Sequence, residues 1–289
     1  MHSSPAPTDW SFDPAVLLAL AALLGGYLFI IGPLRERVAP DEPAQRRRII
    51  AFAAGWLTLA LALVSPLDAL GRAYLFSAHT LQLFLLITVV APLFLIGLPE
   101  WLWWTLLPTR ALRDATRGVL FPTVAVIAFN GIILIWHVAP LYEAALHRAP
   151  LHDLQNASFL LAGLLTWWPL LTPLDRHTRL ASPFQILYLV VESLPLDVFG
   201  AFTLFAQRVF YPTYALAPRL FGLSPLADQA IGGAILAVPG NLLDIVLMSL
   251  AFFGWIAREE QAQAARERLL YDTPQDALGL PAEVKPPGS

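Results

Sequence analysis

The chain has 289 residues, of which 57% are hydrophobic and only 13% are charged, and its formal net charge is -3. This composition lies far outside that of soluble globular domains and predicts an integral membrane protein surrounded by a lipid bilayer, with no nucleic-acid partner. Because the chain has no cysteine and only two methionines, any metal site must use imidazole, carboxylate or carbonyl groups.

Seven apolar stretches are long enough to cross a bilayer as helices, which takes about 20 residues each. They cover residues 14–32, 49–67, 74–98, 119–137, 153–172, 184–207 and 231–256. The runs are continuously apolar and do not alternate with period two, so a β-barrel is not expected. The predicted fold class is therefore all-α, a polytopic membrane bundle of seven transmembrane helices spanning residues 14–256.

The basic residues predict how this bundle is oriented, because cytoplasmic loops are enriched in arginine and lysine. Fourteen of the 18 basic residues fall in the connections after the first, third and fifth stretches and in the tail, against Arg72, Arg148, Arg208 and Arg219 on the other side. We therefore expect residues 1–13 to form a polar segment outside the cell. Residues 257–289 should form a cytoplasmic tail that is partly helical and then disordered.

Histidines gather on the predicted outer side. His79 lies inside the third stretch, His137 closes the fourth, and His147 and His152 lie in or near the connection that follows. Since imidazole binds copper and zinc well, His79, His137 and His152 are candidate metal ligands. The alternative is that each hydrogen-bonds a helix end at the interface. No two histidines have the i, i+4 spacing that places imidazoles on one helix face, so a site would have to form between helices.

Acidic residues within the apolar stretches form a second candidate group: Glu192, Asp197 and Asp244. An acid in the membrane interior is costly unless it is paired, hydrated or protonated, so each suggests a function. We expect these residues to form a buried polar network with Asn130, and proton or ion passage is the alternative. No hydrolase or nucleotide-binding motif is present, so an enzyme is not predicted.

Several segments resemble the CtaG family of cytochrome c oxidase assembly factors over residues 49–256. They read LVSPLDALG (63–71), AHTLQLFLLITVVAPLFLIGLP (78–99), IWHVAPLYEAALHRAPLHDLQNASFLLAGLLTWWPLL (135–171), YPTY (211–214) and LADQAIGG (226–233). The resemblance implies a multi-pass protein of the bacterial plasma membrane that helps to mature a haem-copper oxidase, with oxidase subunits as partners and copper delivered at the outer face. By position, His79, His137 and His152 match the outer histidines of the family, and Asp228 and Gln229 match its Asp-Gln pair.

The chain departs from the family pattern at three positions near these histidines. Leu83 stands where a second histidine is expected four residues after His79, and Gln155 and Asn156 stand where glutamate and histidine are expected after His152. We assign Asn156, Asp228 and Gln229 to polar support at the outer face. The departures leave open an accessory subunit of a respiratory oxidase that has lost its metal. A proton-coupled transporter and a haem-binding protein using His79 and His137 are further alternatives.

Overall fold

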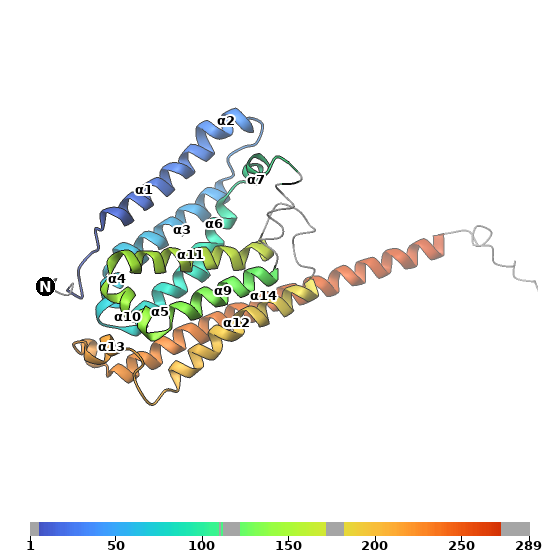
Figure 1. The fold of residues 1–289 in the computed structure, drawn as a ribbon. Coiled ribbons are helices and arrows are strands. Elements are labelled where there is room, and N and C mark those ends of the chain that lie inside the picture. Colours follow the sequence, from blue (N-terminus) through green and yellow to red (C-terminus); the bar gives the residue numbers. More distant parts are fainter. Residues whose placement is uncertain (1–5, 110, 112–121, 172–181, 273–289) are drawn as a thin grey trace, which may run out of the picture.

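The computed structural model describes residues 6–109, 111, 122–171 and 182–272, and all regular structure in these ranges is helical (Figure 1). The long helices are α1 (Pro14–Phe29), α3 (Arg46–Val64), α9 (Pro122–Trp136), α11 (Ala149–Leu171), α12 (Ser182–Leu204) and α14 (Pro225–Asp272). Another long helix runs through α5 (Phe76–Phe84), the π-helical segment η2 (Leu85–Val90) and α6 (Ala91–Gly97). The short elements are η1 (Ile30–Leu34), α2 (Arg35–Val38), α4 (Pro66–Ala73), α7 (Glu100–Leu106), α10 (Ala139–His147), α13 (Pro212–Leu216) and η3 (Leu220–Gly222).

Within the described residues, five helices are long and apolar enough to cross a membrane, and a sixth is added if α9 and α10, bent by 72°, count as one span. The all-helical prediction is confirmed, and the number of seven spans stays a prediction. The described part of the fourth predicted span, α9, has only 15 residues. The fifth predicted span corresponds to α11, whose first turns are polar because they contain His152, Asp153, Gln155 and Asn156.

Several predictions concern residues outside the described ranges. These include part of the basic residues used to predict orientation (Arg110, Arg113, Arg117, Arg176, Arg179 and Lys285) and the end of the tail, residues 273–289, where disorder is expected. The part of the tail that is described continues α14 without a break to Asp272. In Figure 1 this end of α14 extends well beyond the other helices.

Local sequence explains where the first helices begin and end. Asp13 precedes α1, and its carboxylate accepts a hydrogen bond from the Ala15 amide at 2.8 Å, while Pro14 occupies the first helical position. Ser65 and Pro66 repeat the arrangement at the start of α4, where the Ser65 hydroxyl accepts from the Leu67 amide at 3.3 Å. Proline suits the first turn of a helix but cannot continue a preceding one, so α3 ends at Val64 and α4 begins in a new direction.

Helices α12 and α14 pack side by side along most of α12 (Figure 1). They come close together at Gly233, where a Cβ atom would lie 2.5 Å from the carbonyl oxygen of Gly200 and from the amide nitrogen of Leu204. No side chain fits at such distances, so only glycine allows the two backbones to meet here.

The apolar core is formed mainly by α3, α5, α6, α9 and α11. Its fully buried side chains include Leu83, Leu86, Phe129, Ile133 and Phe159. Helix α1 lies at the edge of the bundle (Figure 1), and its only buried residues are Leu20 and Tyr27. Tyr27 stacks on Phe52 with ring centroids 3.6 Å apart.

The two ends of the bundle differ in structure. At one end the short helices α4, α10 and α13 close the bundle, and at the other end lie α2, α7 and the extension of α14 (Figure 1). The first of these ends contains the candidate histidines.

Candidate metal site

The structure brings His79, His137 and His152 together although they come from different helices. His79 lies one turn into α5, His137 lies between α9 and α10, and His152 lies in the first turn of α11. Their exposed fractions are 1%, 8% and 1%. The ring centroid of His79 is 6.4 Å from that of His137 and 6.4 Å from that of His152. His79 is therefore the central member of a buried histidine cluster, a name we keep for these three residues.

His147 does not belong to this cluster. Its side chain is 66% exposed, and its Nε2 lies 3.5 Å from the carboxylate of Glu143 and 3.2 Å from the hydroxyl of Thr213. His177 lies outside the described residues. Among the described histidines, His79, His137 and His152 thus lie together, and their role as metal ligands stays a prediction.

Hydrogen bonds fix the protonation of two of the rings. Nδ1 of His137 lies 2.7 Å from the carbonyl oxygen of Ile133, and Nε2 of His152 lies 3.0 Å from Oδ1 of Asp68. Because a carbonyl and a carboxylate can only accept, each of these nitrogens carries the hydrogen in the neutral ring. Nε2 of His137 and Nδ1 of His152 are then left as lone pairs, and neither has a hydrogen-bond partner.

The ring of His79 has no hydrogen-bond partner at either nitrogen. It packs edge-on against Tyr142, with ring centroids 4.9 Å apart, and against Phe159, with centroids 6.2 Å apart. A neutral imidazole has one donor and one acceptor nitrogen, so both are buried without a partner at the centre of the cluster.

Asp68 in α4 is the main residue of this site that the sequence prediction missed. It is only 5% exposed, and besides His152 it accepts a hydrogen bond from Nε2 of Gln82 at 3.2 Å. Arg72, one turn later in α4, lies 3.9 Å from the other carboxylate oxygen. A carboxylate that accepts from a histidine N–H holds the ring in one orientation and raises the basicity of its other nitrogen. The signal was present in the LVSPLDALG segment, where Asp68 is the only acid.

Unpartnered polar atoms are concentrated around the histidine cluster. In the described part of the chain, ten buried side-chain nitrogen or oxygen atoms have no hydrogen-bond partner. Eight of them belong to six residues: His79, Gln82, His137, His152, Gln155 and Asn156. Leaving a buried polar atom unpaired costs about 1–3 kcal/mol, and such atoms are otherwise rare in folded proteins. Their concentration here indicates a place where a bound ion or water completes the structure.

The donor chemistry of the cluster suits a metal ion, but the spacing is wide. Two imidazoles on a tetrahedral ion, with bonds of about 2 Å, have ring centres about 5 Å apart, and the two measured separations are 6.4 Å. Among the described residues, no three histidine, aspartate, glutamate or cysteine side chains are arranged to hold an ion together. Leu83, at the position where the family pattern has a histidine, is 1% exposed and packs in the apolar core.

Asp228 and Gln229 support the site through the backbone. The carboxylate of Asp228, at the start of α14, accepts from the amide of Phe76 at 2.7 Å and from the amide and hydroxyl of Ser77. It thereby caps the N-terminus of α5, the helix that carries His79. Gln229 accepts from the amide of Phe210 at 2.8 Å and donates to the carbonyl oxygen of Arg208 at 3.1 Å.

Three buried tyrosines cover the cluster on the side of α13. The Tyr211 hydroxyl donates to the carbonyl oxygen of His137 at 2.9 Å, and the Tyr214 hydroxyl donates to that of Gly71 at 2.6 Å. Tyr142 and Tyr214 share a hydrogen bond of 2.9 Å between their hydroxyls. Burial raises the pKa of Tyr211 and of Tyr214, so both phenols stay protonated donors. The YPTY segment thus ties α13 to α4 and to the α9–α10 junction.

The acids of the predicted intramembrane network line a separate cavity of about 50 Å³ between α12, α14, α11, α9 and η2. Glu192 interacts with the Thr166 hydroxyl, Asp197 with Ser193 and Asn241, and Asp244 with Ser193. The side-chain amide of Asn130 contacts the backbone of this group, where it donates to the carbonyl oxygen of Glu192 at 3.2 Å.

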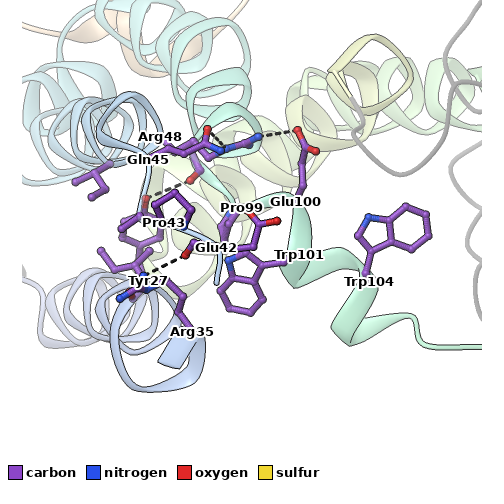
Figure 2. A pocket seen from close by; sticks show the side chains of 14 residues that line it. Tyr27, Arg35, Glu42, Pro43, Gln45, Arg48, Pro99, Glu100, Trp101 and Trp104 are labelled. Carbon is purple, nitrogen blue, oxygen red and sulfur yellow. Dashed lines mark hydrogen bonds and ion pairs between the residues drawn. The ribbon is translucent and has the colours of Figure 1, made fainter. Parts of the chain in front are cut away.

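A further cavity of about 180 Å³ lies at the opposite end of the bundle, between α1, α2, α3 and α7 (Figure 2). Its two arginines are engaged by the protein. Arg48 pairs with Glu100 at 2.7 Å and donates to the carbonyl oxygen of Leu98 at 2.7 Å, and Arg35 donates to the carbonyl oxygens of Ile31 and Glu42. These contacts fix the α2–α3 connection against the end of α6.

The comparisons with known proteins identify the family. No curated protein and no solved structure matches the chain. A family model described as cytochrome c oxidase caa3 assembly factor (Caa3_CtaG) matches residues 25–258, which include every residue of the histidine cluster as well as Asp68, Asp228 and Gln229. The chain belongs to the family of cytochrome c oxidase caa3 assembly factors.

Proposed function

We propose that this protein takes part in the assembly of a caa3-type cytochrome c oxidase and binds a copper ion as transient cargo at the histidine cluster. The observation that supports this proposal most directly is the pair of buried lone pairs on His137 Nε2 and His152 Nδ1, in two rings whose centroids each lie 6.4 Å from the centroid of the unpartnered His79 ring. In this role the protein hands on an ion and oxidase subunits are its partners, without catalysing a reaction of its own.

The ligand type supports copper as the cargo. Imidazole nitrogen is a good ligand for copper and zinc, whereas calcium and magnesium prefer oxygen. His152 and His137 have the outer hydrogen bonds that accompany metal-binding histidines, to a carboxylate and a backbone carbonyl respectively. His79, His137 and His152 would hold the ion, with Asp68 orienting His152.

The wide spacing of the rings supports release as well as binding. A protein that stores a metal presents preformed ligands at bonding distance, and a protein that passes it on needs a weaker site. With ring centroids at 6.4 Å, the rings must move together to share an ion, and this movement lowers the affinity.

We further propose that the chain crosses the bacterial plasma membrane seven times, with α11 and the bent α9–α10 pair included, the N-terminus outside and the C-terminus in the cytoplasm. The distribution of arginine supports this orientation. Arg35, Arg37, Arg46, Arg47 and Arg48 lie in or beside the α2–α3 connection, and Arg258, Arg266 and Arg268 lie in the extension of α14. The histidine cluster lies at the other end of the bundle, which this topology places at the outer face.

The proposal is tested by titrating the purified full-length protein with copper against a chelator of known affinity. We expect one copper per chain, and loss of that binding when His79, His137 and His152 are all replaced by leucine. The same variant should fail to restore the copper content of the oxidase in cells that lack the protein. If the variant binds copper like the wild type, or restores a fully metallated oxidase, the cluster is not a copper site.

An accessory-subunit role remains the second candidate, because the described residues hold no preformed three-ligand set. Purification of the mature oxidase distinguishes the accessory subunit from the assembly factor. A subunit stays with the complex at fixed stoichiometry, and an assembly factor leaves it.

A further inference from the structure

Three amide side chains extend the histidine cluster: Gln82 of α5, and Gln155 and Asn156 of α11. Gln82 and Gln155 are fully buried, and Asn156 is 5% exposed. The side-chain nitrogen of Gln82 and Nε2 of His152 both donate to Oδ1 of Asp68, at 3.2 and 3.0 Å. The amide of Gln82 therefore lies beside the ring of His152.

Gln155 and Asn156 lie on the face of α11 that is turned towards the cluster. Residues three and four positions apart share one face of a helix. His152 lies three and four positions before the two amides, and Phe159 lies four and three positions after them. The ring centroid of His79 is 6.4 Å from that of His152 and 6.2 Å from that of Phe159. Because both ends of this stretch contact His79, the two amides between them face the cluster.

The unpartnered atoms of this site are mostly acceptors. With the tautomers given above, His137 and His152 each present a lone pair, and the neutral ring of His79 presents one lone pair and one N–H. The side-chain oxygens of the three amides are also unpartnered, and the remaining unpartnered atom is the side-chain nitrogen of Gln155. Of the eight atoms, six are thus acceptors and two carry hydrogen. A ligand that satisfies them must supply hydrogen-bond donors or positive charge.

We propose that the cluster takes its cargo as a hydrated cupric ion, Cu(II), whose bound waters donate to the amide oxygens of Gln82, Gln155 and Asn156. This inference rests on the proposed function and specifies the form of copper. Water bound to a cation turns its hydrogens outward, so it supplies the donors that the buried acceptors lack. Cu(II) prefers nitrogen and oxygen ligands, whereas thiolate and thioether select Cu(I), and the chain has no cysteine and only two methionines.

The separation of the rings suits a water between the ion and one of them. Two imidazoles bound directly to one ion have centroids about 5 Å apart. If one ring binds the ion and the other accepts a hydrogen bond from a water on that ion, the centroids are about 6–7 Å apart. The measured separations from His79 to His137 and to His152 are 6.4 Å. The observed positions therefore suit a hydrated ion, and a bare ion shared directly by two rings requires them to move together.

The test compares the two oxidation states of copper in the purified full-length protein and its Gln155→Leu variant. Each state is titrated against a chelator of known affinity, and Cu(I) is kept reduced under anaerobic conditions. Gln155→Leu removes two unpartnered buried atoms at similar volume, so the variant should fold. We expect its affinity for Cu(II) to fall at least tenfold and its affinity for Cu(I) to change less than twofold. Equal changes in both affinities, or no change in either, overturn the proposal and leave copper binding itself standing.

The hydration of the ion has a direct spectroscopic readout. Pulsed EPR of the Cu(II)-loaded protein in D₂O should show deuterium coupling from water bound to the ion, together with nitrogen coupling from imidazole. The Gln155→Leu variant should lose part of the deuterium coupling. An ion without coupling from bound water overturns the hydrated form. Failure to bind copper in either oxidation state overturns the proposed function as well.

Two further variants show whether the effect is local. Gln155→Glu keeps an oxygen acceptor at the same position and should bind Cu(II) at least as tightly as the wild type. Asn130 is a matched control, because it is a buried amide with an unpartnered oxygen that contacts the backbone of Glu192. Asn130→Leu should leave both affinities unchanged. If it lowers the affinity for Cu(II) as much as Gln155→Leu does, the proposal fails.

Discussion

His152 and Asp68 are joined by a buried hydrogen bond of 3.0 Å between Nε2 and Oδ1, although they lie 84 residues apart in the sequence. The bond connects the start of α11 to α4. It leaves Nδ1 of His152 as a lone pair in the interior of the protein. This side-chain hydrogen bond sets the tautomer of His152, and the proposed copper binding depends on the ring nitrogen that it leaves free.

Replacement of Asp68 tests this relationship. Asp68→Asn keeps an acceptor for the His152 N–H but removes the negative charge beside the ring. We expect copper affinity to fall about 10- to 100-fold, the usual loss for partners of metal-binding histidines. The measurement is copper titration against a competing chelator. Glu100→Gln, at the opposite end of the bundle and in an exposed ion pair, is the control and should bind like the wild type.

Replacement of His79 separates function from stability. His79→Leu removes two buried nitrogens that have no partner, so it should not lower the thermal stability of the apoprotein. Copper binding should be lost, since His79 is the only ring that contacts both of the others. Thermal unfolding and copper titration of the same sample check both statements. A clear loss of stability with unchanged copper binding would show that His79 has a packing role alone.

Asn156→His restores the i, i+4 pair with His152 that the family pattern contains. Residues four apart lie on the same helix face, and two imidazoles there can share an ion. We expect copper affinity to rise by roughly tenfold or more, as one added ligand bond contributes on the order of 1.4 kcal/mol or above. Leu154→His adds a histidine to an exposed position of the same helix, where Leu154 is 58% exposed, and should have no such effect. Equal gains in the two variants would mean that the added histidine binds copper independently of His152.

Gly233→Ala tests the close contact between α12 and α14. The new Cβ would lie 2.5 Å from backbone atoms of Gly200 and Leu204, so the helices must separate, and we expect a loss of about 1–3 kcal/mol in the free energy of unfolding. In the same helix, a Cβ at Gly240 would meet nothing within 4 Å. Gly240→Ala should therefore be neutral or stabilise by up to about 1 kcal/mol. Unfolding of the two variants in detergent gives the comparison, and a similar loss in both would refute the packing argument.

Composition and periodicity were enough to predict the helical fold, because a chain in a bilayer must satisfy its backbone hydrogen bonds within each segment. Among the described residues, five or six helices are long and apolar enough to cross a membrane, against seven predicted spans. Apolar length alone defined seven, but α9 is short in its described part and α11 begins with polar residues. Whether such helices cross the membrane depends on what they pack against.

The sequence by itself determined the membrane class, the family and the three histidines that could form a site, since these depend on residue types and their order. Only the tertiary structure decided that the three rings meet, that Asp68 orients one of them, and that they stand 6.4 Å apart. It also showed that the side-chain oxygen of Asn156, where the resemblance led us to expect a histidine, is buried without a hydrogen-bond partner. Distances between side chains on different helices depend on how the helices pack, so they cannot be predicted from the spacing of residues along the chain.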